Sequence, residues 1–210
     1  NHNVDDLGET NIFEESYLKW KNHTKNSILG EEYLKKTNIN GNRLKITTNK
    51  WLYNYQYTGI ITKNIPDAKI IHCFRNPLDN ILSIYRENFM KIPFSTDIKE
   101  ITEMYIHHYN LMKFYSKTYS KSIFVYRYDD VVKNPSFEIK KIIDWLGWDW
   151  TEEYTEPHKN KRSVFTASSE QVRNPIHSKS LGGWKKYSDL LEPALELISN
   201  NKDLKRFSTE

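Results

Sequence analysis

The sequence has few of the residues that mark disulfide-rich, fibrous or membrane proteins. It contains one cysteine, Cys73, so no disulfide can form within the chain, and a reducing, cytoplasmic compartment is expected. No apolar run approaches the roughly 18 residues needed to span a bilayer, and the N-terminus has no basic-then-apolar signal pattern. Glycine and proline are scattered singly, without a repeat or linker. We therefore expect one soluble domain over residues 1–210.

An excess of charge of one sign is also nearly absent. The 31 Lys and Arg residues against 27 Asp and Glu residues give a net charge of +4, which suits an anionic ligand but is low for a nucleic-acid binder. The 14 tyrosines and six tryptophans keep an RNA-binding module as an alternative, although core positions explain them better. Because no Cys and His spacing matches a zinc site, we expect no metal, and the low charge predicts no nucleic-acid partner.

Short apolar or β-branched runs with turn signals nearby predict buried strands, and helical patterns separate them. The strands are RLKIT (43–47), KIIHCF (69–74) and SIFVYR (122–127), and the helices cover 54–65, 77–89, 97–119, 134–147 and about 190–200. Gly147 is the expected stop of the fourth helix, and Cys73 is expected in the core. Alternating strands and helices predict an α/β fold with a central parallel sheet flanked by helices in three layers.

The segment after the second strand carries clear start signals for a helix. Asn76 is a good N-cap, Pro77 suits the first helical position, and Asp79 stands three residues after the cap, as in a capping box. At about 100° per residue, the apolar side chains fall on one side of this helix and Ser83 falls on the other. Ser83 is therefore predicted to face away from the core.

Arg75 stands between that strand and that helix. In open α/β sheets, ligands bind outside the carboxyl ends of strands, and a helix N-terminus there offers free N–H groups to an anion. A guanidinium matches a phosphate bidentately, and the Ser83 hydroxyl adds a further donor. Arg75 and Ser83 are thus candidates for a phosphate clamp. The alternative is an ordinary turn whose arginine pairs with a surface carboxylate.

The stretch RNPLDNILS resembles the signature with which sulfotransferases bind the 3′-phosphate of 3′-phosphoadenosine-5′-phosphosulfate (PAPS). In that signature, an arginine at a strand end and a serine eight residues later grip the phosphate, and Arg75 and Ser83 have this spacing. The resemblance implies that PAPS is the co-substrate, that the desulfated nucleotide PAP is the product, and that the reaction needs no metal.

The likeness continues over nearly the whole chain in four ordered blocks. It is closest to bacterial sulfotransferases that are often fused to tetratricopeptide repeats, a branch related to tyrosylprotein sulfotransferases. These relatives imply a three-layer, P-loop-like α/β fold. The blocks are TNKWLYNYQYTGIITKNIPDAKIIHCFRNPLD, YRENFMKIPFSTDIKEITEMYIHHYNLMKFY, VYRYDDVVKNP and FTASSEQVRNPIHSKSLGGWKKY.

The resemblance implies catalytic roles for two residues. Glu9 in LGET matches the Gly-Glu of tyrosylprotein-type enzymes, whose glutamate is the general base, and a nearby carboxylate can take the proton of an attacking hydroxyl. Lys50 matches the family's lysine, which would stabilise negative charge on the transferring sulfuryl group or on the bridging oxygen. The alternatives are a solvated glutamate and an exposed structural lysine.

The resemblance also implies cofactor contacts in the last two blocks. Tyr128 corresponds to a tyrosine that contacts PAPS, and Ser168 corresponds to a serine that contacts the phosphosulfate. Ser169, Gln171 and Arg173 lie in the loop that would surround the cofactor, with Arg173 as a further phosphate ligand.

Two residue positions depart from the family pattern. The family has Arg or Lys directly before the last-motif tryptophan, whereas this chain has Gly183 before Trp184, so Lys185 after it becomes the basic candidate for binding the cofactor. The small-molecule branch has a histidine base before the phosphate loop, and TTNKWLYN contains none. His72 falls in a predicted strand and is expected to be buried or to line the site rather than to act in catalysis.

A third departure concerns the other end of PAPS. In the family, a strand-loop-helix grips the 5′-phosphosulfate one helix before the glutamate, and here that glutamate is residue 9. We therefore expect an N-terminal truncation of a sulfotransferase domain that retains the 3′-phosphate side of the site and lacks the 5′ side, which puts catalysis by this fragment in doubt.

A small-molecule kinase or another P-loop-type transferase is the nearest alternative because it shares the α/β layout. It predicts a Gly-rich loop ending in Lys-Ser/Thr and carboxylates for magnesium, and the sequence has no such loop. Preference for PAP over ATP would separate the two. The acceptor would be a hydroxyl of a peptide tyrosine, a carbohydrate or a small molecule, and a homodimer stays open.

Overall fold

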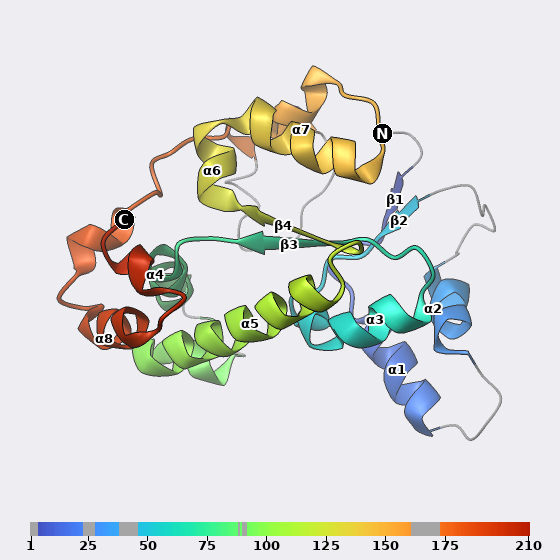
Figure 1. Cartoon of the computed structure of the whole chain (residues 1–210), viewed down its shortest axis with the longest axis horizontal. Coiled ribbons are helices and arrows are strands. Elements are labelled where there is room, and N and C mark those ends of the chain that lie inside the picture. Colours follow the sequence, from blue (N-terminus) through green and yellow to red (C-terminus); the bar gives the residue numbers. More distant parts are fainter. Residues whose placement is uncertain (1–3, 23–27, 38–45, 88, 90–91, 161–172) are drawn as a thin grey trace. The chain divides into compact units, whose positions relative to one another are not determined.

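The computed structural model describes residues 4–22, 28–37, 46–87, 89, 92–160 and 173–210 (Figure 1). Its contacts cluster in two compact units, each of which is described by itself. Unit 1 consists of Asn1–Ile70 and Leu111–Ile123, and unit 2 consists of Ile71–Asn110 and Phe124–Glu210.

Unit 1 combines a two-stranded parallel sheet with helices. Strand β1 pairs with β2, and Asp5 stands opposite Thr47 in the register. Phe13 and Leu29 are buried in the core of the unit, where the Phe13 ring lies 5.4 Å from that of Tyr33. The elements are β1 (Val4–Asp6), α1 (Ile12–Asn22), α2 (Leu29–Thr37), β2 (Ile46–Thr48), the 3₁₀ helix η1 (Leu52–Tyr57) and α3 (Thr58–Asn64).

Unit 2 is built around strands β3 and β4, which pair in a second two-stranded sheet. Figure 1 shows β3 leading into α4 and β4 leading into α6. The long helix α5 contributes residues to both units. The main elements are β3 (Ile70–Phe74), α4 (Pro77–Glu87), α5 (Ile98–Thr118), β4 (Ile123–Arg127), α6 (Tyr128–Lys133), α7 (Pro135–Leu146), the 3₁₀ helix η6 (Gly183–Tyr187) and α8 (Glu192–Asn200).

The core of unit 2 forms where α4, α5, η6 and α8 bury their apolar faces. On α4, Leu78 and Ile81 have no exposed surface, as predicted for the inner face of this helix. Burial of each such side chain contributes roughly 1.5–3 kcal/mol, so this cluster holds the helices in place. Its members are Leu78, Ile81, Leu82, Ile98, Ile101, Tyr105, Trp184, Leu191, Ala194, Ile198, Leu204 and Phe207.

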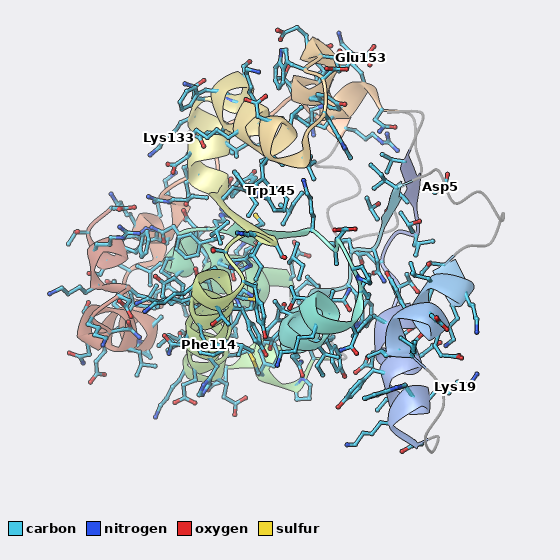
Figure 2. All side chains as sticks on the ribbon, turned by 45° about the vertical axis from the view of Figure 1, so that its right-hand side comes forward. Asp5, Lys19, Phe114, Lys133, Trp145 and Glu153 are labelled. Carbon is cyan, nitrogen blue, oxygen red and sulfur yellow. The ribbon has the colours of Figure 1, made fainter. Side chains whose placement is uncertain are left out.

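Helix α7 covers part of β4. The Trp145 side chain points from α7 toward the strand (Figure 2), and its ring lies 5.4 Å from that of Phe124. The helix stops at Gly147, whose φ of 75° is left-handed and whose N–H donates to the carbonyl of Ile143. This is the glycine stop that the sequence predicts.

The predicted strands at 69–74 and 122–127 agree with β3 and β4 to within a residue. The predicted strand at 43–47 agrees only in part, because β2 covers Ile46–Thr48 and residues 43–45 lie outside the described part of the chain. The helix predicted at 54–65 begins as a 3₁₀ helix and becomes α-helical only at Thr58.

The prediction that Cys73 lies in the core is wrong, because its side chain is exposed. Cys73 shares one face of β3 with Ile71, which is 44% exposed. Neighbours in the described part of unit 2 therefore cover this face of the strand only partly.

Helix α5 is the longest in the described structure, with 21 residues. It carries charged residues throughout, including Lys99, Glu103 and Lys113. Within the described ranges, no helix combines the length and the apolar character needed to cross a membrane.

Candidate functional site

The predicted helix start after Arg75 is confirmed in detail. The Asn76 side-chain oxygen accepts the backbone N–H of Leu78 at 2.9 Å and that of Asp79 at 3.4 Å, so Asn76 is the N-cap of α4. Pro77 follows at the first position of the helix and has no N–H to satisfy. The chain thus turns sharply from β3 into α4, and Arg75 stands at that turn.

The predicted capping box is wrong. A capping box would direct the Asp79 carboxylate back to the N–H of Asn76. Instead, Asp79 accepts the N–H of Gly182 at 2.7 Å and the N–H of Trp184 at 3.0 Å, while the N–H of Asn76 donates to Asp129 at 2.9 Å. The spacing of Asn76 and Asp79 fits a capping box, but spacing in the sequence cannot reveal backbone donors that lie far along the chain.

The Arg75 side chain is held on two sides, by a hydrogen bond and by an aromatic ring. Its Nη2 donates to the carbonyl of Ser180 at 2.8 Å, and its guanidinium lies 5.5 Å from the ring centre of Tyr128. Its Nε is buried and has no hydrogen-bond partner. A buried donor without a partner costs about 1–3 kcal/mol, and a bound anion would relieve that cost.

The backbone of Arg75 is fixed as well. Its carbonyl accepts the Tyr105 hydroxyl at 2.7 Å, and burial raises the pKa of that tyrosine, so the hydroxyl keeps its proton. Tyr128 follows β4 as Arg75 follows β3. Contact between the residues that follow both strands places these strand ends at one edge of the sheet, where ligands of α/β proteins bind.

A second buried carboxylate supports this edge. Asp129 is 3% exposed and accepts both the N–H of Asn76 and, at 3.0 Å, the Nε of Arg127. Arg127 also pairs with Glu210. Burial opposes the charge of Arg127, but the hydrogen bonds to Asp129 and Glu210 outweigh it and raise the pKa of the guanidinium. The network ties the end of β4 to the start of α4.

Replacing Asp129 by asparagine tests this network. We expect Asp129→Asn to lower the free energy of unfolding by about 2 kcal/mol, because it removes the charge opposite a partly buried arginine. Denaturant unfolding measures the change. Asp130→Asn on the same helix is the matched control, with an expected change within about 0.5 kcal/mol. Equal effects of both substitutions would contradict the role given to Asp129.

In unit 1, the ends of β1 and β2 bring together two other predicted residues. The N–H of Lys50 donates to the carbonyl of Gly8 at 3.0 Å, and the Asp6 carboxylate accepts the Thr48 hydroxyl at 2.7 Å. The first of these bonds continues the pairing of the two strands beyond their ends, and the second joins their last paired residues. As a result, the Lys50 ammonium forms an ion pair with Glu9.

The Glu9–Lys50 pair is open to solvent, since the lysine side chain is 60% exposed and the glutamate side chain 33% exposed. Partial desolvation lowers the pKa of Lys50. An exposed pair contributes little to stability, so its structural value is small.

The remaining predicted residues are less closely tied to Arg75. Ser83 is exposed on α4, as predicted. Arg173 is also exposed and donates to the carbonyl of Asn160. The Lys185 ammonium lies 5.9 Å from the ring centre of Trp184. The predicted ligands that lie outside the described residues are Ser168, Ser169 and Gln171.

Residues 11–152 match the model of the sulfotransferase family. This match covers more than half of the chain. The chain belongs to the sulfotransferase family. The family predicted from RNPLDNILS is therefore confirmed, and the kinase and RNA-binding alternatives are not favoured. Arg75, Ser83, Lys50 and Tyr128 lie within the matched residues, and Glu9 lies just before them.

One relative shares a large part of this sequence. An uncharacterized protein of Aquifex aeolicus (strain VF5) is 31% identical over 150 residues, which cover 70% of this chain and 20% of that protein. The chain thus spans a fifth of the length of that relative.

Two solved structures share the fold. The sulfotransferase domain from the curacin biosynthetic pathway is 12% identical, with a TM-score of 0.54 over 92% of this chain and 66% of that chain. Mouse sulfotransferase SULT7A1 complexed with PAP is 14% identical, with a TM-score of 0.56 over 99% of this chain and 88% of that chain. The predicted P-loop-like α/β fold class is confirmed.

Three residues that hold Arg75 in place were not predicted from the sequence. Asp129 and Tyr105 fix the backbone around Arg75, and the Ser180 carbonyl contacts its guanidinium. One signal was available: YDDVV places two acidic residues directly after the predicted strand, and a buried acid there requires partners. Neither Tyr105 nor Ser180 carries a comparable signal.

His72 is partly buried in β3, as predicted, and its ring lies 5.0 Å from that of His108. Burial and then the neighbouring His108 lower the pKa of His72 from 6.5 to about 4. Between these values the unfolded chain binds more protons than the folded one. Acidification through this window therefore destabilises the fold.

We expect the unfolding free energy to fall as the pH drops from about 6.5 to 4, with His72 contributing up to about 3 kcal/mol. Chemical denaturation across this range measures the slope. His72→Gln should flatten it, whereas His107→Gln, a change at an exposed position on α5, should preserve it. An unchanged slope in His72→Gln would show that other groups set the pH dependence.

Proposed function

We propose that the chain binds PAPS and takes part in transfer of its sulfuryl group to an acceptor hydroxyl. The observation that carries this proposal is the buried, unpartnered Nε of Arg75 beside Tyr128 at the sheet edge. A guanidinium with a free donor in a partly dry position suits a phosphate dianion. The complex of the mouse sulfotransferase with PAP supports the choice of nucleotide.

The first turn of α4 contributes less to phosphate binding than a free helix N-terminus would. Its amides at Leu78 and Asp79 already bond to Asn76, and Pro77 has none. The 3′-phosphate would therefore depend on the Arg75 guanidinium, with the exposed Ser83 hydroxyl as a second donor. The helix dipole adds a smaller favourable contribution.

The other cofactor contacts are proposed from the family resemblance. Tyr128 would contact the nucleotide while it orients Arg75 from one side. Arg173 would leave the carbonyl of Asn160 to bind a phosphate, and Lys185 would supply the charge that Gly183 lacks. Three loop residues complete the proposed set: Ser168, Ser169 and Gln171.

The chemistry is a displacement at sulfur. The acceptor oxygen forms a bond to sulfur as the bond between sulfur and the 5′-phosphate oxygen breaks, and PAP leaves with the electron pair. We assign Glu9 the role of taking the acceptor proton, since its side chain is a carboxylate that is partly open to solvent beside Lys50. Lys50 would stabilise charge on the sulfuryl group or the bridging oxygen.

Two further predictions belong to this proposal. The acceptor is a hydroxyl of a peptide tyrosine, a carbohydrate or a small molecule. The compartment is cytoplasmic.

Calorimetric titration of the 210-residue chain with PAP and with magnesium ATP tests the proposal. We expect PAP to bind in the micromolar range and at least about tenfold more tightly than ATP, because ATP has no 3′-phosphate for Arg75. Tighter binding of ATP would instead support a transferase of the kinase type.

A further inference from the structure

Asp79 is a buried carboxylate for which the proposed reaction has no use. It is 4% exposed, lies in the first turn of α4, and makes no capping bond to Asn76. Burying a carboxylate is costly unless hydrogen bonds compensate it. Both of its oxygens accept backbone N–H groups from a segment about a hundred residues later in the chain, those of Gly182 and Trp184.

The segment that Asp79 holds is a tight turn. Gly182 has a left-handed φ of 66°, and its carbonyl accepts the N–H of Lys185 at 3.2 Å. Before it, the N–H of Leu181 donates to the carbonyl of Ser178 at 3.0 Å. Trp184 is buried in the core of unit 2. Asp79 and Trp184 thus fix one end of the turn firmly.

The same turn contacts the proposed phosphate ligand. The Ser180 carbonyl, two residues before Gly182, accepts Nη2 of Arg75 at 2.8 Å. This bond occupies one end of the guanidinium fork and leaves Nε as the buried donor without a partner. The position of the Ser180 carbonyl therefore determines which N–H groups of Arg75 can meet a ligand.

We propose that Asp79 is a positioning residue for the 3′-phosphate site. By holding Gly182 and Trp184, it places the Ser180 carbonyl against Arg75 and so orients the guanidinium for the phosphate. This inference rests on the proposed binding of PAPS. It differs from a purely structural role because its effect depends on whether the ligand has a 3′-phosphate.

The test compares two nucleotides that differ by that phosphate. Affinities of the unaltered chain and of Asp79→Asn are measured by calorimetry for PAP and for adenosine 5′-monophosphate (AMP). Asparagine keeps the shape but turns an amide toward one of the two N–H groups. We expect PAP to bind about tenfold more weakly to the variant, and AMP to bind within about twofold of the unaltered chain.

A control separates positioning from general loss of stability. Thr102 is fully buried in α5 and donates its hydroxyl to the carbonyl of Ile98 at 2.6 Å. Thr102→Val should lower the thermal midpoint without changing the ratio of PAP to AMP affinity. In a background of Arg75→Ala, Asp79→Asn should have little further effect on PAP, since it acts through that arginine.

A second readout does not depend on the nucleotide. Lys179 is exposed one residue before Ser180, so release of the turn should speed trypsin cleavage there several-fold in Asp79→Asn and not in Thr102→Val. Unchanged cleavage would show that Asp79 does not hold the turn in place. Faster cleavage with an unchanged ratio of affinities would overturn the positioning role. If the unaltered chain fails to prefer PAP over AMP, the proposed function falls and the inference falls with it.

Discussion

Arg75→Ala is expected to weaken PAP binding by about 100-fold while AMP binding changes by less than about threefold. The Nε and Nη2 donors of Arg75 lie at the start of α4, and the first-turn amides are already bonded to Asn76. Loss of charge-assisted bonds to a phosphate costs about 1.5–3 kcal/mol, which corresponds to this range of affinities. Calorimetry with both nucleotides measures the effect.

The matched control for this prediction is Arg86→Ala. Arg86 is exposed in the last turn of α4, so its substitution removes the same charge at a position away from the end of β3. We expect its effect on PAP affinity to stay within about twofold, because long-range charge is screened. If both variants weakened PAP equally, net charge rather than a specific contact would explain the binding.

Glu9→Gln is expected to reduce the rate of sulfuryl transfer by about 10²- to 10⁴-fold, the usual range for loss of a general base. The amide cannot take the acceptor proton but can still hydrogen-bond to Lys50. Because an exposed ion pair stabilises little, the thermal midpoint should be almost unchanged. Transfer from ³⁵S-labelled PAPS to a tyrosine peptide, an oligosaccharide and a phenol measures the rate, using the acceptor that the unaltered chain labels fastest.

Glu31→Gln is the matched control for Glu9→Gln, since Glu31 is an exposed glutamate in the first turn of α2 in the same unit. Its transfer rate should match that of the unaltered chain. Transfer by Glu9→Gln within about threefold of normal would assign the base to another group and leave Glu9 as a surface partner of Lys50.

Local signals in the sequence predicted most of the fold around Arg75. Alternating strands and helices, the Asn76 cap and the glycine stop at Gly147 depend on residues close in the chain, and each appears in the structure. The exposed side of α4 at Ser83 follows from helical periodicity in the same way. Arg75 became a candidate because a cation stands between a strand and a capped helix, and the resemblance of RNPLDNILS to a phosphate-binding signature favoured it over an ordinary turn.

The parts that could not be predicted depend on contacts between distant residues. Asp79 fits a local capping pattern, yet its partners Gly182 and Trp184 lie about a hundred residues away. Cys73 fits a buried strand, yet its face of β3 is only partly covered. Which local pattern is used, and which face of a strand is covered, depends on tertiary packing that a single sequence does not display.

The ion pair of Glu9 with Lys50 could be predicted only in part. The family resemblance gave each residue a role, but no local pattern joined residues 41 positions apart. Their contact follows from the parallel pairing of β1 with β2, which brings the ends of both strands together. Predicting this contact from the residues alone would have required recognising VDD as a strand. Three residues show too little periodicity for that.

The most direct test of the central claim is calorimetric titration of the unaltered 210-residue chain with PAP and with AMP. Recognition of a 3′-phosphate by Arg75 predicts that PAP binds at least about 30-fold more tightly than AMP. Equal affinities, or tighter binding of AMP, would contradict the claim that this edge of the sheet is a site for the 3′-phosphate of PAPS.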